Sequence, residues 1–291
     1  MTNPDDTSVI IIGAGPVGLT VAALLLASPQ SSRLRINVLE SRPAPAWSPD
    51  QTDLRVYALS RASQRILEHA GAWQEIAAAR ASRYGRMQVW EGDDATGLGS
   101  LTFDCAELGE PDLGHIVEDR LIRDRLYRLL DASTSVELRA GVELAAVRSE
   151  SRAVEIETQS GETFQATVLV AADGGASTVR SLLDLPVATT AYGQEALVTH
   201  VVSARPHAET AWQRFRPDGP LAFLPLLDGR SSVVWSMNSG EAQRLSSVSD
   251  EAFIDELQPV SGDVLGEIEA CTARARFPLR ALHARRYCSS R

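Results

Sequence analysis

The stretch VIIIGAGPVGLTVAALLLA, residues 9–27, combines features of a membrane span with those of a nucleotide-binding turn. It carries no charge and approaches the roughly twenty apolar residues that a membrane helix needs. Three glycines and Pro16 fall within residues 13–18, however, and interrupt the run. We therefore expect a β-branched strand over 8–12, a tight glycine turn, and then a helix. Strand, turn and helix in this order are the context in which GxGxxG indicates a dinucleotide site.

The glycine turn has a distinct requirement at each position. Gly13 permits the tight turn, Gly15 lets a pyrophosphate approach the backbone, and Gly18 lets the helix pack closely on the strand. Ala14 and Pro16 complete the turn and bring the first helical amides toward the phosphates. These amides are unpaired donors with partial positive charge, so they favour an anion.

A second strand, RINVLE at 35–40, ends in an acid. Glu40 follows Gly18 by 22 residues, close to the spacing at which a carboxylate accepts hydrogen bonds from ribose hydroxyls. A glycine turn in an unrelated α/β protein would not account for this acid. The three features together predict a dinucleotide-binding site.

The composition excludes several classes of function. The net charge of −10 argues against nucleic acid as a partner, because binding there depends on neutralising phosphates. All 28 basic residues are arginine, so no Schiff-base or phosphate-loop lysine exists. Cys105, Cys271 and Cys288 are widely spaced, which predicts no disulfide framework and no cysteine zinc site. The polar N-terminus has no basic residue before Arg33, and we expect a cytoplasmic protein.

Two later segments bear on the nature of the dinucleotide. A proline-rich loop after Glu40 leads into RVYALSRASQRILEHAGAW, residues 55–73, whose apolar spacing predicts a helix. From residue 136 the pattern changes to strands, with QSGE at 159–162 as a hairpin turn. AADGGASTVR, residues 171–180, is a strand end followed by a small-residue turn and a helix. Its Asp173-Gly174 pair can reach ribose or pyrophosphate hydroxyls, or it can be a turn alone.

These segments together resemble the single-component flavin-dependent aromatic hydroxylases related to para-hydroxybenzoate hydroxylase. The resemblance implies FAD as cofactor and NAD(P)H as reductant, with the Asp-Gly motif serving both. It indicates the following cofactor-binding residues: Gly13, Ala14, Gly15, Pro16, Gly18, Glu40, Arg42, Arg55, Asp173 and Gly174. No nucleophile, catalytic triad or metal cluster is expected, because the flavin carries the chemistry and the protein positions the ring.

Four further segments resemble the ubiquinone-biosynthesis subfamily of these hydroxylases. They are LGHIVEDRLIRDRLYRLL at 113–130, YGQEALVTHVV at 192–202, the stretch 211–236, and FPLRALHARRY at 277–287. The resemblance implies hydroxylation of the aromatic ring of a polyprenylated phenol by molecular oxygen. The prenyl tail of such a substrate suggests peripheral contact with the inner face of a membrane or with partner proteins of ubiquinone biosynthesis.

The expected fold is α/β, with a Rossmann-like FAD-binding lobe interleaved with a mixed β-sheet substrate lobe. The first takes residues 1–80 and 112–185, and the second takes 81–111 and 186–291. Apolar strands of the second lobe can wall a pocket for a ring and its tail, although plain sheet core explains any single residue better. Two interpretations of EDRLIRDR at 118–125 stand: a helix that approaches the flavin, or a solvated charged face, which we favour.

The family has a third FAD signature, Gly-Asp-Ala-Ala-His with a proline–glycine segment, which in relatives follows a stretch such as ARRYCSSR. The sequence stops there, at Arg291, so we expect the C-terminal part of the FAD lobe to be absent. Two alternatives to the hydroxylase remain. One is a catalytically incompetent fragment that acts as a partial nucleotide-binding module. The other is a related flavin monooxygenase with another aromatic substrate.

Overall fold

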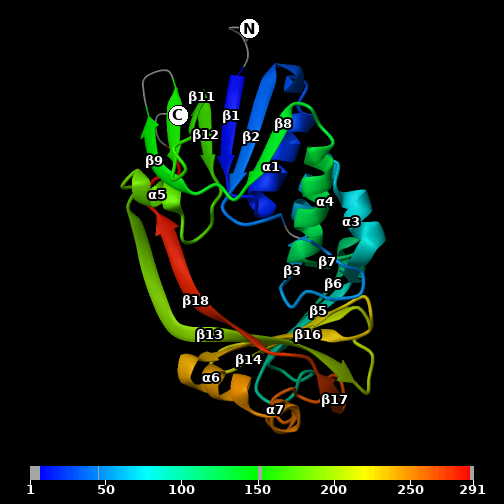
Figure 1. Cartoon of the computed structure of the whole chain (residues 1–291). Coiled ribbons are helices and arrows are strands. Elements are labelled where there is room, and N and C mark those ends of the chain that lie inside the picture. Colours follow the sequence, from blue (N-terminus) through cyan, green and yellow to red (C-terminus); the bar gives the residue numbers. More distant parts are fainter. Residues whose placement is uncertain (1–6, 45, 150–152, 289–291) are drawn as a thin grey trace.

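A parallel sheet forms the centre of one half of the molecule (Figure 1). The computed structural model describes residues 7–44, 46–149 and 153–288. The sheet's four strands, in spatial order, are β12 (Val168–Ala171), β1 (Thr7–Ile12), β2 (Leu34–Glu40) and β8 (Val136–Ala140). Because all four run the same way, their carboxyl ends meet at one edge, where ligands of such sheets bind.

The opening stretch is a strand, a turn and a helix, as predicted. β1 is β-branched along most of its length, and its last four residues are buried between neighbours on both sides. Helix α1 (Pro16–Ala27) starts after Gly15 with Pro16 in its first turn, where the missing N–H costs nothing. No helix among the described residues is long and apolar enough to cross a membrane.

Both faces of the parallel sheet are covered, which explains its nearly continuous apolar strands. One face packs against α1 and α4 (Asp119–Asp131), and α2 (Arg61–His69) and α3 (Trp73–Arg80) pack against these two helices in the same core. The other face packs against α5 (Thr178–Leu182) and an antiparallel sheet of β9 (Leu144–Ser149), β10 (Val154–Thr158) and β11 (Thr163–Ala166). The predicted hairpin turn at 159–162 joins β10 and β11. A short 3-10 segment, Ser31–Arg33, precedes β2.

The helix predicted over residues 55–73 is wrong in its first part. Residues 56–60 form strand β3 (Val56–Ser60), which pairs antiparallel with β7 (Gly114–Glu118) beside β4 (Ala81–Tyr84). The helix α2 begins only after Ser60, whose side chain caps it by accepting a hydrogen bond from the Ser63 amide. A distant partner strand therefore overrides the local helical spacing.

The other half of the molecule is built on an eight-stranded sheet. Seven strands follow in the order β17 (Ile268–Cys271), β13 (Val187–Ser203), β16 (Ser231–Asn238), β15 (Leu221–Pro225), β14 (Thr210–Phe215), β5 (Arg86–Glu91) and β6 (Ser100–Asp104). The eighth, β18 (Ala275–Ala284), pairs with β13. Helices α6 (Ser239–Ser247) and α7 (Asp250–Leu257) cover one face, and a 3-10 segment, Cys105–Leu108, follows β6.

Two long strands connect the halves. β13 and β18 run antiparallel from the large sheet up to α5 of the other half (Figure 1). We propose the same two interleaved lobes as the sequence suggests, with one boundary moved. Residues 81–84 pair with β7 rather than with the large sheet, so we place the first boundary at Gly85. The two lobes are called the FAD lobe and the substrate lobe below.

Candidate functional site

The glycine turn lies at the carboxyl edge of the parallel sheet and contacts the neighbouring strand ends. The Gly13 amide donates to Leu39 O at 2.8 Å, and the Ala172 amide donates to Ile12 O at 2.8 Å. Gly13 has a φ of +104°, and a Cβ there would meet the backbone oxygen of Ala172 at 2.4 Å. Only glycine therefore fits at this position without displacing backbone.

The other two glycines of the motif differ in their surroundings: Gly18 is tightly packed, whereas Gly15 faces open space. A Cβ on Gly18 would meet the backbone oxygen of Gly13 at 2.0 Å, so this residue serves the close packing of the helix on the turn. A Cβ on Gly15 would meet nothing within 4 Å. The backbone at Gly15 is thus accessible from the adjoining cavity, and the N-terminus of α1 follows directly. This arrangement fits an approaching pyrophosphate.

Glu40 ends β2 and faces the same turn. Its Oε2 accepts from the Ala14 amide at 2.7 Å, and its Oε1 accepts from the Arg42 amide at 3.0 Å and from the Ser41 hydroxyl at 3.2 Å. Burial opposes ionisation of Glu40, but these hydrogen bonds outweigh it, so the pKa of Glu40 lies below its usual value. The carboxylate is therefore charged at neutral pH and ties the strand end to the glycine turn.

A cavity of about 660 Å³ opens in front of this edge. Its lining includes eight of the ten residues that the sequence indicates for cofactor binding: Gly13, Gly15, Pro16, Glu40, Arg42, Arg55, Asp173 and Gly174. The exceptions are Gly18, which packs the helix, and Ala14, which lines a smaller hollow behind Glu40. The volume is within the range of small-molecule and cofactor sites.

Three arginines from separate segments surround this cavity. Arg42 follows β2, Arg55 precedes β3, and Arg123 comes from α4. Arg123 Nε donates to Ala14 O at 3.1 Å, so a helix more than a hundred residues away braces the glycine turn. Arg42 and Arg55 form no ion pair with a carboxylate among the residues that the structure describes. Both can face a negatively charged ligand.

Two further lining residues were not foreseen from the sequence. Tyr57 donates its hydroxyl to Asp119 Oδ1 at 2.9 Å, and Asp119 also pairs with Arg123 at 3.6 Å. Burial, together with the charge of Asp119, raises the pKa of Tyr57 to about 12. Tyr57 is therefore a neutral donor at any ordinary pH. The pattern VYALS at 56–60 is also compatible with a strand that exposes this ring, but the helix predicted over 55–73 includes it.

The segment EDRLIRDR is only in part the solvated face that we favoured. Glu118 is 2% exposed and Asp119 is 7% exposed, because both lie at the junction of β7 and α4 inside the FAD lobe. Arg123 lines the cavity, whereas Arg120 is largely exposed and pairs with Asp53. The charged sequence of this segment gives no sign that Glu118 is buried, because the partners of Glu118 lie in other segments.

The Asp173-Gly174 pair lies where the resemblance predicts, at the end of β12. Asp173 Oδ2 accepts from the Val179 amide at 3.1 Å and so fixes the start of α5, while Gly174 has a φ of +80°. Arg180 Nη2 donates to Gly175 O at 2.6 Å and braces the turn. Both members of the pair line the large cavity, so the segment is a turn that also faces the site.

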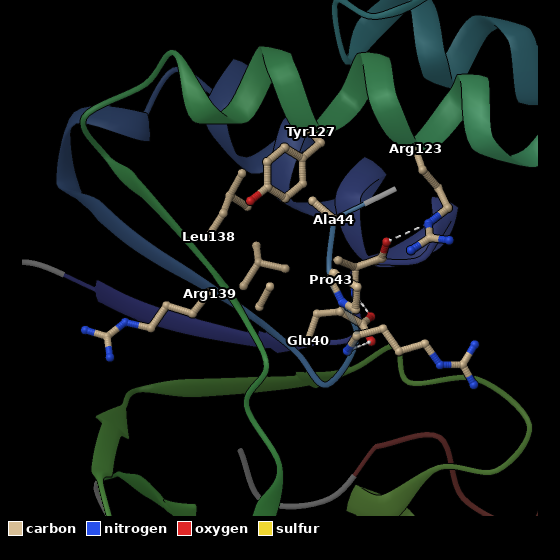
Figure 2. A pocket seen from close by; sticks show the side chains of 11 residues that line it. Glu40, Pro43, Ala44, Arg123, Tyr127, Leu138 and Arg139 are labelled. Atoms are coloured by element: carbon tan, nitrogen blue, oxygen red, sulfur yellow. Dashed lines mark hydrogen bonds between the residues drawn. The ribbon is translucent and has the colours of Figure 1, made fainter. Parts of the chain in front are cut away.

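A smaller hollow lies behind Glu40, between α4 and the strands β2 and β8. Figure 2 shows Tyr127 and Leu138 on one side of it and Glu40 and Pro43 on the other. Its lining is mostly apolar, and it shares Glu40, Arg42 and Arg123 with the large cavity. Its volume of about 10 Å³ holds about one water molecule, so the hollow is a recess beside Glu40 and not a second ligand site.

Across the described ranges 7–44, 46–149 and 153–288, no group of three or more histidine, cysteine, aspartate or glutamate side chains could hold a metal ion. The site thus consists of a glycine turn at a helix N-terminus, a strand-end carboxylate, an Asp-Gly turn and three arginines around one cavity. This set is typical of proteins that bind a dinucleotide at the edge of a parallel sheet.

The family comparison agrees with this class. The chain matches the model of the FAD binding domain family over residues 6–291. It therefore belongs to this family of FAD-dependent monooxygenases.

Characterised relatives cover nearly the whole chain. It is 33% identical over 288 residues to 3-demethoxyubiquinol 3-hydroxylase of Escherichia coli, covering 99% of this chain and 71% of that protein. It is 34% identical over 275 residues to the mitochondrial ubiquinone biosynthesis monooxygenase COQ6 of Xenopus tropicalis, covering 87% of this chain and 56% of that protein. The chain thus spans between about half and three quarters of the length of these two relatives.

The fold is also similar to that of a solved monooxygenase. The crystal structure of p-nitrophenol 4-monooxygenase from Pseudomonas putida matches with a TM-score of 0.71 at 19% identity, covering 98% of this chain and 71% of that chain. At this identity the likeness concerns the fold alone.

Proposed function

We propose that the protein is an FAD- and NAD(P)H-dependent monooxygenase that hydroxylates the aromatic ring of a polyprenylated phenol in ubiquinone biosynthesis. The observation that carries the proposal is the 33% identity over 99% of the chain to an enzyme named for this reaction. The cavity supports it, because the residues around the cavity are those that an FAD pyrophosphate and ribose require.

The residues divide the work of holding FAD. Gly13, Gly15 and the N-terminus of α1 would face the pyrophosphate, and Glu40 would accept from the ribose hydroxyls. Arg42, Arg55 and the Asp173-Gly174 turn would complete the contacts to the cofactor.

The chain's own contribution to the reaction is binding, orientation and charge. When bound, FAD supplies the redox chemistry: NAD(P)H provides two electrons, one atom of oxygen enters the ring, and the other leaves as water. The arginines around the cavity would balance the phosphate charges, while Tyr57 stays protonated beside Asp119. No side chain needs to act as a nucleophile in this scheme.

The proposed substrate also bears on where the protein lies in the cell. A polyprenyl tail partitions into lipid, so we propose a cytoplasmic protein at the inner face of the membrane, held peripherally or through other proteins of ubiquinone biosynthesis.

The test is a reaction with defined substrates. Purified protein loaded with FAD is mixed with NAD(P)H, oxygen and a short-chain polyprenyl phenol, and the product is analysed by mass spectrometry. We expect NAD(P)H oxidation coupled to a product that is heavier by one oxygen atom. Bound FAD without hydroxylation of any prenylated phenol, but with hydroxylation of a simple phenol, would instead indicate another aromatic substrate. Failure to retain FAD would indicate a catalytically incompetent fragment.

A further inference from the structure

The loop of residues 46–55 leads into β3, and an ion pair away from the cavity supports it. Glu118 and Arg80 form this support, with Arg80 Nη1 at 3.1 Å from Glu118 Oε1. Glu118 is 2% exposed and the Arg80 side chain 16% exposed. Neither residue lines the cavity. A buried ion pair outside a site needs a reason, because its desolvation offsets much of its attraction.

Both members of the pair bind the loop directly. Glu118 Oε2 accepts from the Asp53 amide at 2.6 Å, and its Oε1 accepts from Trp47 Nε1 at 3.4 Å. Arg80 donates to Gln51 O and to Thr52 Oγ1, each at 3.1 Å, and also to Pro49 O. The loop has no helix or strand of its own, so these contacts replace a hydrogen-bond ladder.

Trp47 strengthens the same attachment. Its ring lies 5.3 Å from the Arg80 guanidinium and 4.9 Å from that of Arg125 on α4. Both distances are within the range of favourable cation–π contacts. The loop is therefore fixed to α3 and α4 as well as to β7.

Asp53 connects the attached loop to Arg55, which lines the cavity. Asp53 Oδ1 accepts from the Arg55 amide at 3.2 Å, and the Arg55 carbonyl accepts from the Asp119 amide at 2.9 Å. The backbone of Arg55 is thus held on both sides, although its side chain is free of carboxylate partners in the described part of the chain. Arg55 lines the cavity and stacks on the Tyr57 ring at 5.5 Å.

The loop also contacts the substrate lobe. Thr52 Oγ1 accepts from Arg230 Nη2 at 2.8 Å and lies 3.4 Å from Asp228 Oδ2, in the turn between β15 and β16. The same hydroxyl accepts from Arg80. One short loop therefore connects the buried pair, the large sheet and the cavity.

We propose that Glu118 and Arg80 are positioning residues that hold the 46–55 loop and thereby place Arg55 for binding the FAD phosphates. This inference rests on the proposed function, because it takes FAD as the ligand of the cavity. It assigns the pair no contact with the cofactor.

The test compares Glu118→Gln with a matched control, Asp112→Asn. Asp112 is 7% exposed and pairs with Arg61 at 3.1 Å, and neither residue contacts the 46–55 loop. Both variants neutralise one buried carboxylate beside an arginine. We expect similar losses in melting temperature, but an FAD dissociation constant raised at least tenfold, about 1.4 kcal/mol, only in Glu118→Gln. If the two variants have similar melting temperatures but only Glu118→Gln binds FAD more weakly, Glu118 positions the site and does not merely stabilise the fold.

A double-mutant cycle tests whether Glu118 acts through Arg55. If it does, Glu118→Gln has little further effect on FAD affinity in an Arg55→Ala background, because the positioned group is already gone. Additive effects of the two substitutions would overturn the proposal, and so would an unchanged FAD affinity in Glu118→Gln.

Hydrogen exchange of the FAD-free protein provides a readout that does not depend on the cofactor. We expect faster exchange of the loop amides, including Asp53 and Arg55, in Glu118→Gln than in Asp112→Asn. Equal exchange in the two variants would show that the pair does not hold the loop. If the wild-type protein binds no FAD, the proposed function fails, and the exchange result still decides the role of the pair.

Discussion

The two sheets of this protein are covered in different ways, and the difference separates their roles. The parallel sheet of the FAD lobe is buried on both faces, so only its carboxyl edge can meet a ligand. The large sheet packs one face on α6 and α7, and its edge strand β6 leaves Leu101 and Phe103 exposed. The parallel sheet therefore exposes backbone amides and charged groups at its carboxyl edge, whereas the large sheet exposes side chains on its surface.

The largest expected effect concerns two glycines of one turn. Gly13→Ala places a methyl group 2.4 Å from Ala172 O at a φ of +104°, and it should cost about 4 kcal/mol or more of unfolding free energy. Gly15→Ala meets no atom within 4 Å and should cost at most about 1 kcal/mol. Urea unfolding of both variants measures this. Equal costs would show that the turn is not shaped as described.

The second prediction compares the cores of the two lobes. Phe253→Ala empties the fully buried core beneath the large sheet and should cost about 3–5 kcal/mol, with FAD affinity changed less than twofold. Leu121→Ala should cost about 2–5 kcal/mol and also weaken FAD binding, because Leu121 anchors the helix that carries Arg123. Thermal unfolding with an FAD titration distinguishes the variants. Equal effects on FAD affinity would contradict the division into lobes.

The third prediction uses a buried histidine of the large sheet. Burial, and then the nearby charge of Arg230, lowers the pKa of His200 from 6.5 to about 4. The unfolded chain binds the proton more readily, so His200 contributes stability above pH 6.5 that is lost as the pH falls toward 4. The loss should reach up to about 3 kcal/mol. His200→Gln should show a flatter pH dependence by urea unfolding, unlike the exposed control His69→Gln.

The smallest expected effects come from helix caps, one in each lobe. Ser60 caps α2 through the Ser63 amide, and Ser249 caps α7 through the Ala252 amide. Replacing either serine by alanine should cost about 1 kcal/mol, because the amide loses its partner. Thermal unfolding should give similar losses for both, with no change in FAD affinity. Loss of FAD binding in either variant would contradict this prediction, because it would show that the helix cap and the FAD site are coupled.

What the sequence predicts well in this chain is local. The glycine turn and Glu40 lie within 28 residues of one another, and the fold only has to bring β1 and β2 side by side. The hairpin between β10 and β11 is equally local. In these segments the chemistry of the site and the signal for secondary structure come from the same few residues.

What the sequence conceals depends on distant partners. The local spacing predicts helix where β3 forms, because the partner strand β7 lies more than fifty residues further on. The sequence predicts a solvated Glu118, because its partners come from a loop and a helix end far away in the chain: Trp47, Asp53 and Arg80. No periodicity within EDRLIRDR could reveal a carboxylate that is buried by other segments.

We propose that the cavity at the edge of the parallel sheet binds FAD through the open backbone at Gly15. The most direct test is one titration: flavin fluorescence is followed as FAD binds to the FAD-free wild-type protein and to Gly15→Ala. We expect saturable one-to-one binding to the wild type and at least tenfold weaker binding to the folded variant. Equal affinity for both proteins, or no saturable binding to the wild type, would contradict it.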